Sequence, residues 1–331
     1  MRVIAIALLA LGLTGCAATP EATVVIEGTV HSGGSALAVD PSSTRVVSGG
    51  WEGWLQVWRI TDGAPLARWK AHDGSVNGAV FLTDDLILSA GYDGAVATWE
   101  PGGRRVSSHG TGSPVTAFDI SADRSVFVTG HSDGYIRWWK TDGLKPISQM
   151  HLHEGSEVLA VAMHPSGTMV ASSDDDGRVA LVGPDGKYRW LDVPPTDALT
   201  LTFAKEGGTL FGAGWFDLYR WDSAGEKVKV LPTEHRGEIK RITFTPDGRQ
   251  IASISRQTDS HVLLLDPATG STTQAVGKHD LCGGVVTLSP NGRFIVSTSD
   301  DATVRIWDRR DPRVVPPAGG ASVPGAKPGT W

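Results

Sequence analysis

The chain has 331 residues, of which 40% are hydrophobic, and its formal net charge at neutral pH is −6. This length and composition suit one large folded domain or two ordinary ones. The lack of a basic excess argues against nucleic acid as the main partner.

The chain opens with a short apolar segment. Met1-Arg2 carries one positive charge, and residues 3–15 are almost wholly apolar. As a helix this run would measure about 20 Å, which is short of a hydrocarbon core of ~30 Å. Residues 1–15 are therefore predicted to be a signal peptide, with an ordinary secretory signal or a buried helix as the alternatives.

The apolar run ends in Leu13-Thr14-Gly15-Cys16, which resembles the lipobox of bacterial lipoproteins. This resemblance implies cleavage before Cys16, lipidation of Cys16 by acyl chains such as palmitate, and residues 16–22 as a lipidated tether. Cys282 would then have no partner for an internal disulfide. Ala17 further implies the bacterial cell envelope as the location, at the outer membrane facing the periplasm in a diderm cell.

A repeat of strand-closing residues occupies the rest of the chain. The positions that end β-like runs lie 39 to 44 residues apart: Trp58, Trp99, Trp139, Val182, Trp221, Leu265 and Trp307. An acid precedes most of them by six residues in a turn: Glu52, Asp93, Asp133, Asp176, Asp259 and Asp301. Each unit contains three or four short strands and no helix, and this period is typical of propeller blades.

The repeats resemble the WD-repeat family, because Trp221-Asp222 and Trp307-Asp308 carry its Trp-Asp pair. The resemblance covers residues 23–309 and implies an all-β, seven-bladed β-propeller. Residues 23–30 read as a strand without a blade of its own, so we expect them to supply the outer strand of the last blade and close the ring. Residues 310–331 are rich in Pro, Gly and Ala and are predicted to be a flexible tail.

The same resemblance implies hydrogen-bonded tetrads that stabilise individual blades. Two units contain a full set: His72, Ser89, Asp93 and Trp99, and His279, Ser297, Asp301 and Trp307. A His, a Ser and an Asp could also form a hydrolase triad, but their recurrence in successive units favours a structural role. The units that end at Val182 and Leu265 lack the Trp, and the Trp221 unit has an irregular turn, so we expect looser packing or a function there.

Metal and catalytic motifs are incomplete. His151 and His153 lack a third ligand nearby, and residues 174–177 resemble part of a calcium loop without its downstream Glu. There is no Gly-rich phosphate loop and no Gly-x-Ser-x-Gly elbow. The prediction is therefore a protein that is not an enzyme and has no metal or cofactor.

In WD-repeat propellers the residue before the turn acid projects onto the top face of the ring. The resemblance carries this role to Trp51, Tyr92, Ser132, Asp175, Thr258 and Asp300, and to Trp215 in the irregular unit. Exposed aromatic side chains are enriched where proteins bind each other. We expect an aromatic and acidic surface that binds a protein or peptide.

The functional prediction is a monomeric, membrane-anchored, non-catalytic interaction scaffold of the bacterial cell envelope. The alternative is an enzyme or a receptor for a small ligand or metal that uses the central channel. That alternative needs polar side chains on the first strand of several units. The first strands considered, 36–39, 115–118, 159–162 and 285–288, are mostly small and apolar, which disfavours it.

Overall fold

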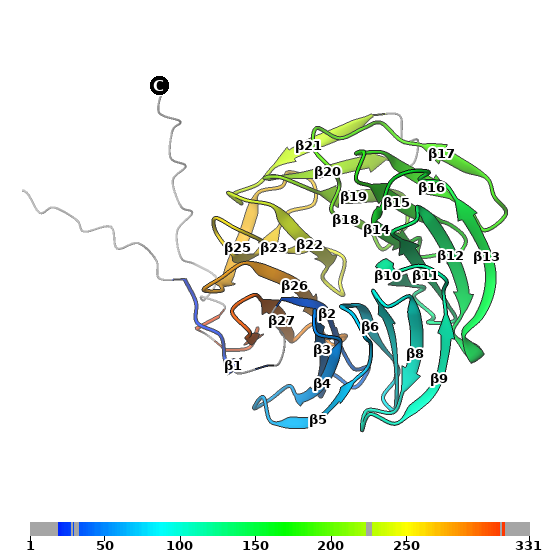
Figure 1. Cartoon of the computed structure of the whole chain (residues 1–331). Helices are drawn as coiled ribbons and strands as arrows, with labels where there is room; N and C mark the ends of the chain where they lie inside the picture. Colours follow the sequence, from blue (N-terminus) through cyan, green and yellow to red (C-terminus); the bar gives the residue numbers. More distant parts are fainter. Residues whose placement is uncertain (1–18, 28, 30–32, 223–226, 312, 315–331) are drawn as a thin grey trace, which may run out of the picture.

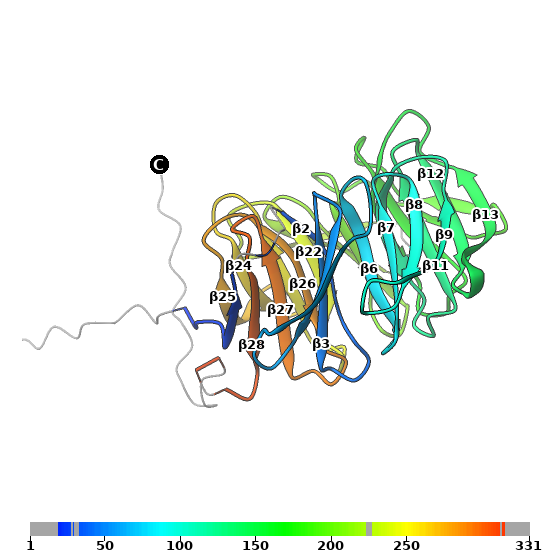
Figure 2. The same cartoon turned by 60° about the horizontal axis from the view of Figure 1, so that its bottom comes forward.

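The computed structural model describes residues 19–27, 29, 33–222, 227–311 and 313–314. These residues form seven four-stranded antiparallel sheets. The sheets are arranged as blades around a central axis, with the first strand of each blade innermost (Figure 1). Seen from the side, the strands run from one face of the ring towards the other (Figure 2).

Six blades consist of four consecutive strands each. Their bounds are β2 (Gly34–Val39), β3 (Arg45–Gly50), β4 (Trp54–Arg59) and β5 (Pro65–Lys70) in blade 1; β6 (Val76–Thr83), β7 (Leu86–Gly91), β8 (Ala95–Trp99) and β9 (Arg105–Gly110) in blade 2; β10 (Val115–Ile120), β11 (Val126–His131), β12 (Tyr135–Lys140) and β13 (Lys145–His151) in blade 3; β14 (Val158–Met163), β15 (Val170–Asp174), β16 (Val179–Val182) and β17 (Tyr188–Trp190) in blade 4; β18 (Thr200–Phe203), β19 (Thr209–Ala213), β20 (Asp217–Asp222) and β21 (Val228–Pro232) in blade 5; and β22 (Ile239–Phe244), β23 (Ile251–Ser255), β24 (His261–Leu265) and β25 (Thr272–Lys278) in blade 6.

Blade 7 joins the two ends of the described chain. It contains β26 (Gly283–Leu288), β27 (Phe294–Ser299) and β28 (Val304–Asp308), and β1 (Val24–Ile26) pairs with β28 as the outer strand. In Figure 1 the blue segment of β1 lies beside the orange strands of this blade. The predicted closure of the ring by the N-terminal strand is confirmed.

The repeat period also gave the correct strand ends. Each closing residue lies at the last or next-to-last position of the third strand of its blade: Trp58 in β4, Trp99 in β8, Trp139 in β12, Val182 in β16, Trp221 in β20, Leu265 in β24 and Trp307 in β28. The described residues contain one short 3₁₀ turn, η1 (Asp142–Leu144), and no α-helix. The all-β, seven-bladed prediction is therefore confirmed.

Apolar side chains of neighbouring blades pack against each other to form the core. Trp58 of blade 1 shares a buried cluster with Val285 and Phe294 of blade 7. Trp69 of blade 1 meets Trp99 of blade 2 with ring centroids 6.0 Å apart. Each Trp can remove about 150–250 Å² from water, so these contacts fasten one blade to the next.

The predicted signal peptide, residues 1–15, and the lipidation site Cys16 lie outside the described residues. The same is true of most of the predicted tail, 310–331. The boundaries of these segments stay predictions. Among the residues that the structure does describe, no helix is long and apolar enough to cross a membrane.

Candidate functional site

The blade 2 tetrad is a continuous chain of hydrogen bonds. His72 Nδ1 lies 2.9 Å from Asp93 Oδ1, and His72 Nε2 lies 2.8 Å from the Ser89 hydroxyl. A carboxylate only accepts, so Nδ1 carries the proton and Nε2 accepts from Ser89. Trp99 Nε1 donates to the same Ser89 oxygen over 2.9 Å. Burial opposes the charge of Asp93, but hydrogen bonds from His72 and the Asp73 amide outweigh it and lower the pKa of Asp93.

The second predicted tetrad is complete except for its Trp. His279 lies 2.7 Å from the Ser297 hydroxyl and 3.1 Å from Asp301. Trp307 Nε1 is buried and has no hydrogen-bond partner among the described residues. The Trp307 ring instead packs edge-on to His279, with ring centroids 6.1 Å apart. The two blades therefore differ by one buried hydrogen bond.

Blade 3 forms an equivalent set that the sequence analysis missed. His131 comes from the end of β11 rather than from the loop before the blade. Its Nε2 lies 2.8 Å from the Thr129 hydroxyl, which also accepts from Trp139 Nε1 over 2.9 Å. His131 Nδ1 donates to the Ser113 carbonyl. In the sequence this set could be recognised by a His, His131, that lies two residues after the hydroxyl residue Thr129 of the second strand.

In blades 4 and 6 the histidine forms hydrogen bonds with residues other than those that the spacing of the repeat suggested. His153 pairs with Asp174 at 2.6 Å, whereas Asp176 accepts from the Ser156 hydroxyl. In blade 6, His235 bonds the Ser253 hydroxyl at 2.8 Å. Ser255, which precedes the turn acid Asp259 by four residues as Ser89 precedes Asp93, is buried and its hydroxyl has no partner in the described part of the chain. A fixed offset along the strand does not decide which face a hydroxyl occupies.

None of these serines is placed to act as a nucleophile. Ser89 and Ser297 are fully buried, so a substrate cannot reach their oxygens. Ser89 is held between an imidazole and an indole N–H. The arrangement favours a structural role over a hydrolase triad.

Buried His131 should make stability depend on pH. Burial, with the charge of Arg137, lowers the pKa of His131 from 6.5 to about 4. A His that stays neutral in the folded state takes up a proton more readily when unfolded, so stability falls as pH drops from 6.5 towards 4. The contribution over that window is roughly 3 kcal/mol.

We expect urea unfolding to show this loss between pH 7 and pH 5. The wild type should lose about 2 kcal/mol more over that range than the His131→Gln variant, which has no titrating group at this position. Equal losses in the two proteins would show that His131 is not held neutral. His279, whose pKa is also lowered by burial, remains in both proteins and serves as the common background.

The predicted binding residues all lie in the same kind of turn. We call the side of the ring that carries the turns between second and third strands the top face. Every predicted position falls in such a turn, one in each blade: Trp51, Tyr92, Ser132, Asp175, Trp215, Thr258 and Asp300. Since the blades have the same topology, these turns lie on one face of the ring.

Three aromatic side chains on this face are exposed. Trp51, Tyr92 and Trp215 expose 51%, 47% and 37% of their surfaces. Trp215 stands beside exposed Phe216, with ring centroids 5.6 Å apart. Trp51 leans over Gly33, where a Cβ would lie only 2.3 Å from the indole. Gly33 has φ of +73°, so this close approach needs a glycine.

The predicted acidic and polar positions are partly engaged. Asp300 forms an ion pair with Arg256 at 2.8 Å. Asp175 is exposed and accepts from the Glu157 amide. The hydroxyl of Thr258 donates to the Arg236 carbonyl, and the hydroxyls of Ser132 and Ser113 lie 3.4 Å apart. The acidic character expected at Asp300 is therefore offset by a neighbouring cation.

The inner strands share a bulge at the mouth of the central channel. Six of the seven inner strands shift register near their second residue, and the extra residues include Ser35, Asn77, Thr116, Leu159, Lys240 and Gly284. Bulges redirect side chains and often lie beside binding sites. Three of these residues donate to the first inner-strand carbonyl of the next blade: Ser35 to Val76, Asn77 to Val115 and Thr116 to Val158.

The channel is more polar than the first strands 36–39, 115–118, 159–162 and 285–288 predicted. Strand β22 contributes Lys240 and Arg241 to its wall. Lys240, Arg241 and Arg256 line a cavity of about 230 Å³ at the channel mouth, together with Trp51. The basic pair in Ile239–Phe244 was visible in the sequence and would have identified this wall.

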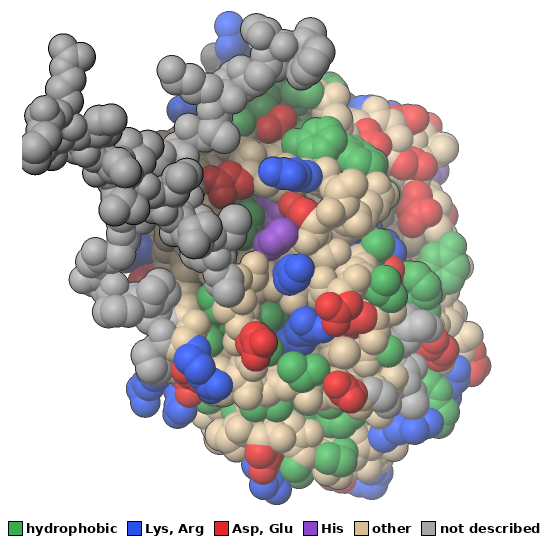
Figure 3. Space-filling model, turned by 90° about the vertical axis from the view of Figure 1, so that its left-hand side faces the viewer, with side chains coloured by type: hydrophobic (Ala, Val, Ile, Leu, Met, Phe, Trp, Pro, Cys, Tyr) green, Lys and Arg blue, Asp and Glu red, His purple; other side chains and the backbone are tan. Residues whose placement is uncertain are grey.

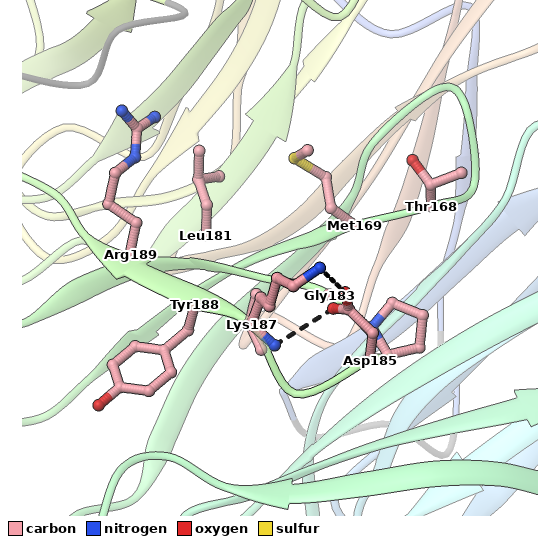
Figure 4. A pocket seen from close by; sticks show the side chains of 10 residues that line it. Thr168, Met169, Leu181, Gly183, Asp185, Lys187, Tyr188 and Arg189 are labelled. Atoms are coloured by element: carbon pink, nitrogen blue, oxygen red, sulfur yellow. Dashed lines mark hydrogen bonds and ion pairs between the residues drawn. The ribbon is translucent and has the colours of Figure 1, made fainter.

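Blade 4 contains a second hollow. A cavity of about 460 Å³ lies along its outer strands and includes Met169, Leu181 and Tyr188. Figure 4 shows Met169, Leu181 and Arg189 pointing to one side of the blade and Tyr188 to the other. The outer strand β17 has only three residues. The hollow fits the looser packing expected in the unit that ends at Val182.

The remaining features of the described structure are the predicted metal motifs and the distribution of surface charge. Within the described ranges, no group of three His, Cys, Asp or Glu side chains could hold a metal ion. His151 stacks on Tyr135, while His153 belongs to the blade 4 hydrogen-bond chain. On the side of the ring shown in Figure 3, acidic and basic side chains are interspersed without a large area of one sign.

Comparison with known proteins shows the family. The family described as "WD domain, G-beta repeat" matches residues 24–59, 63–100, 103–140, 144–181 and 272–308, which is more than half of the chain. The chain belongs to this WD-repeat family. Residues 182–271 lie outside those matches, yet blade 5 and the first three strands of blade 6 fall there, and both blades have the same four-stranded architecture as the others.

The similar proteins are eukaryotic. The chain is 27% identical to "Ribosome biogenesis protein YTM1" of Chaetomium thermophilum over 84% of this chain and 58% of that protein. It is 24% identical to "Ribosome biogenesis protein ytm1" of Aspergillus clavatus over 83% of this chain and 58% of that protein. It is 31% identical to "Protein HIR1" of Kluyveromyces lactis over 57% of this chain and 21% of that protein. The chain thus spans less than two thirds of the length of these relatives.

These relatives correct part of the functional prediction. The prediction of a membrane-anchored scaffold of the bacterial cell envelope is wrong, because the two of these relatives that match more than four fifths of this chain are fungal proteins named for ribosome biogenesis. The keywords lipoprotein, membrane and cell envelope and the location at the outer membrane are corrected with it. That prediction depended on four residues at the end of an apolar run, whereas the comparison extends over 304 residues. Lipidation of Cys16 itself lies outside the described residues.

Two further predictions are confirmed by the comparisons. WD repeat and β-propeller are confirmed by the family match. The prediction that the protein is not an enzyme is confirmed by the family and by relatives named for ribosome biogenesis rather than for a reaction.

Proposed function

We propose that the protein is a scaffold whose propeller binds a protein or peptide partner through the aromatic side chains of its top face. The observation that carries this proposal is the exposure of Trp51, Tyr92 and Trp215 in turns on the same side of the ring. Large aromatic side chains are costly to leave in water and are frequent hot spots in interfaces.

The arrangement suits a rigid display surface. Trp51 and Tyr92 belong to neighbouring blades, and Trp215 with Phe216 belongs to blade 5. Their backbones are held by seven hydrogen-bonded sheets, so little ordering is needed when a partner binds. Membership of the WD-repeat family supports a protein partner over a small substrate.

The triple variant Trp51→Ala, Tyr92→Ala, Trp215→Ala should lose its partner. We expect capture from cell extract to fall at least about ten-fold, because each hot-spot aromatic contributes more than about 1 kcal/mol to binding. The matched control is Leu66→Ala, Val106→Ala, Ile147→Ala, which removes side chains of similar exposure from the outer strands β5, β9 and β13. A top-face site would be refuted if capture fell equally in the two triple variants, or if it fell in neither of them.

The same experiment tests whether ribosome biogenesis, the process in the names of two relatives, also involves this chain. Ribosomal proteins or assembly factors that are captured by the wild type and lost with the top-face variant would extend ribosome biogenesis to this chain. If the captured proteins include neither ribosomal proteins nor assembly factors, the similarity to the relatives extends only to the propeller fold.

A further inference from the structure

The central channel holds a guanidinium group that has no hydrogen bond within the described residues. The Arg241 side chain forms no ion pair there either, and it interacts only at longer range with the charge of Asp119. It lines both the cavity of about 230 Å³ at the channel mouth and a narrower one of about 100 Å³ beyond it. A guanidinium carries five N–H donors in a planar fork, and those of Arg241 are open to a ligand in the channel because this residue is exposed.

Several polar groups of the channel wall already have partners. Ser35, Asn77 and Thr116 each donate to a carbonyl of the next blade. Asp119 accepts from the Met163 amide over 2.7 Å. Arg256 is paired with Asp300. The Arg241 guanidinium brings the largest set of N–H donors in this wall that has no hydrogen bond to a described residue.

A second cation stands at the neighbouring position. Lys240 is the bulged residue of β22 and lies 3.8 Å from its closest acid, Glu238, which is long for an ion pair. Burial lowers the pKa of Lys240, with Glu238 acting against this effect. Lys240 and Arg241 both line the mouth cavity, so two cations of blade 6 face the same space.

Asp119 lines the narrower cavity and limits which ligands can bind there. Burial raises the pKa of Asp119. Backbone hydrogen bonds from Met163 and Ile120 and the charge of Arg241 act to lower it, but burial has the larger effect. A carboxylate ligand would meet the fork of Arg241 in a bidentate manner. A multiply charged phosphate would meet repulsion from Asp119 when the latter is ionised.

We infer that the mouth of the central channel binds a carboxylate group, held by Arg241 with support from Lys240. The group can come from a free small carboxylic acid or from the C-terminus of a peptide that enters the channel. Trp51 of the top face lines the same cavity, but the carboxylate would be held by Arg241 and Lys240, so its binding can be tested without changing the aromatic residues.

Thermal unfolding of the full chain at constant ionic strength tests the inference. The probes are acetate, inorganic phosphate and an N-acetylated alanine tripeptide with a free or an amidated C-terminus, each against chloride. We expect acetate or the free-acid peptide, at millimolar concentration, to raise the melting temperature saturably by about 2–4 °C. Phosphate and the amidated peptide should give less than half of this shift.

The variants assign the effect to the channel. Arg241→Gln should abolish the shift, and Arg241→Lys, which keeps the charge and loses the fork, should weaken apparent affinity about ten-fold. Arg105→Gln removes a cation from the exposed outer strand β9 and should keep the full shift. A response to acetate alone identifies a free acid, and a response to the free-acid peptide alone identifies a chain end.

Other outcomes would overturn the inference. No saturable shift up to 20 mM ligand, on the order of the weakest binding that such a small site should show, excludes the site. A shift that persists in Arg241→Gln places the binding elsewhere. If Arg241→Gln does not fold, Lys240→Gln and Arg241→Lys decide the outcome, because unchanged affinity in both contradicts the assignment.

Discussion

Replacing Ser89 with alanine is expected to lower the free energy of unfolding by about 2–4 kcal/mol. Ser89 Oγ is fully buried and bridges His72 Nε2 and Trp99 Nε1. The substitution removes both hydrogen bonds and leaves two buried polar groups unsatisfied. Thermal and urea unfolding of the wild type and the variant under the same conditions would measure the loss.

Blade 7 provides the control for this prediction. Ser297 occupies the equivalent position, but Trp307 Nε1 already lacks a partner in the described structure, so only the bond to His279 is lost. Ser297→Ala should therefore cost about 1–2 kcal/mol. If the two variants lose the same stability, the bond from Trp99 to Ser89 contributes nothing measurable.

Replacing Ile26 with alanine is expected to destabilise the closed ring by about 2–4 kcal/mol. Ile26 is 5% exposed and packs in the cluster that contains Trp58 and Ile306. It belongs to β1, which pairs with β28 through Val24↔Ile306 and Ile26↔Val304. Loss of its side chain weakens the contact that joins the first and last strands.

The neighbouring residue separates ring closure from a general effect of mutating β1. Val25 lies on the opposite face of the same strand and is 44% exposed. Val25→Ala should change stability by less than about 0.5 kcal/mol. Equal effects at the two positions would mean that β1 is not seated against blade 7 in solution. Hydrogen exchange of β28 amides should also speed up in Ile26→Ala and not in Val25→Ala.

Much of the fold could be predicted because the blades repeat. The third strand of each blade ends at or next to one of the seven closing residues, and β1 lies in the run that was expected to close the ring. The hydrogen-bond partners were predicted less well. Asp174 replaces Asp176, Ser253 replaces Ser255, and His131 supplies an imidazole from inside a strand. Bulges and turn geometry shift a side chain to another face without changing the period.

The candidate site was predicted in part. The turn positions of Trp51, Tyr92 and Trp215 followed from the repeat, but their exposure depends on what packs beside them, such as Gly33 beneath Trp51. The cations of the channel were missed, although Lys240 and Arg241 stand in a run that alternates like the other inner strands. The error in the cellular setting came from a motif of four residues that lies outside the described part of the chain.

The sequence by itself determined the class of fold, the number of blades and the closure of the ring. These properties follow from local patterns: alternating apolar residues, turns at fixed intervals and a spare strand at the start. Only the tertiary structure decided which side chains share the channel and the top face. The inner strands of blades 1 to 7 meet around one axis only after the ring has closed, so Trp51, Arg241 and Arg256 line one cavity although they lie far apart in the chain.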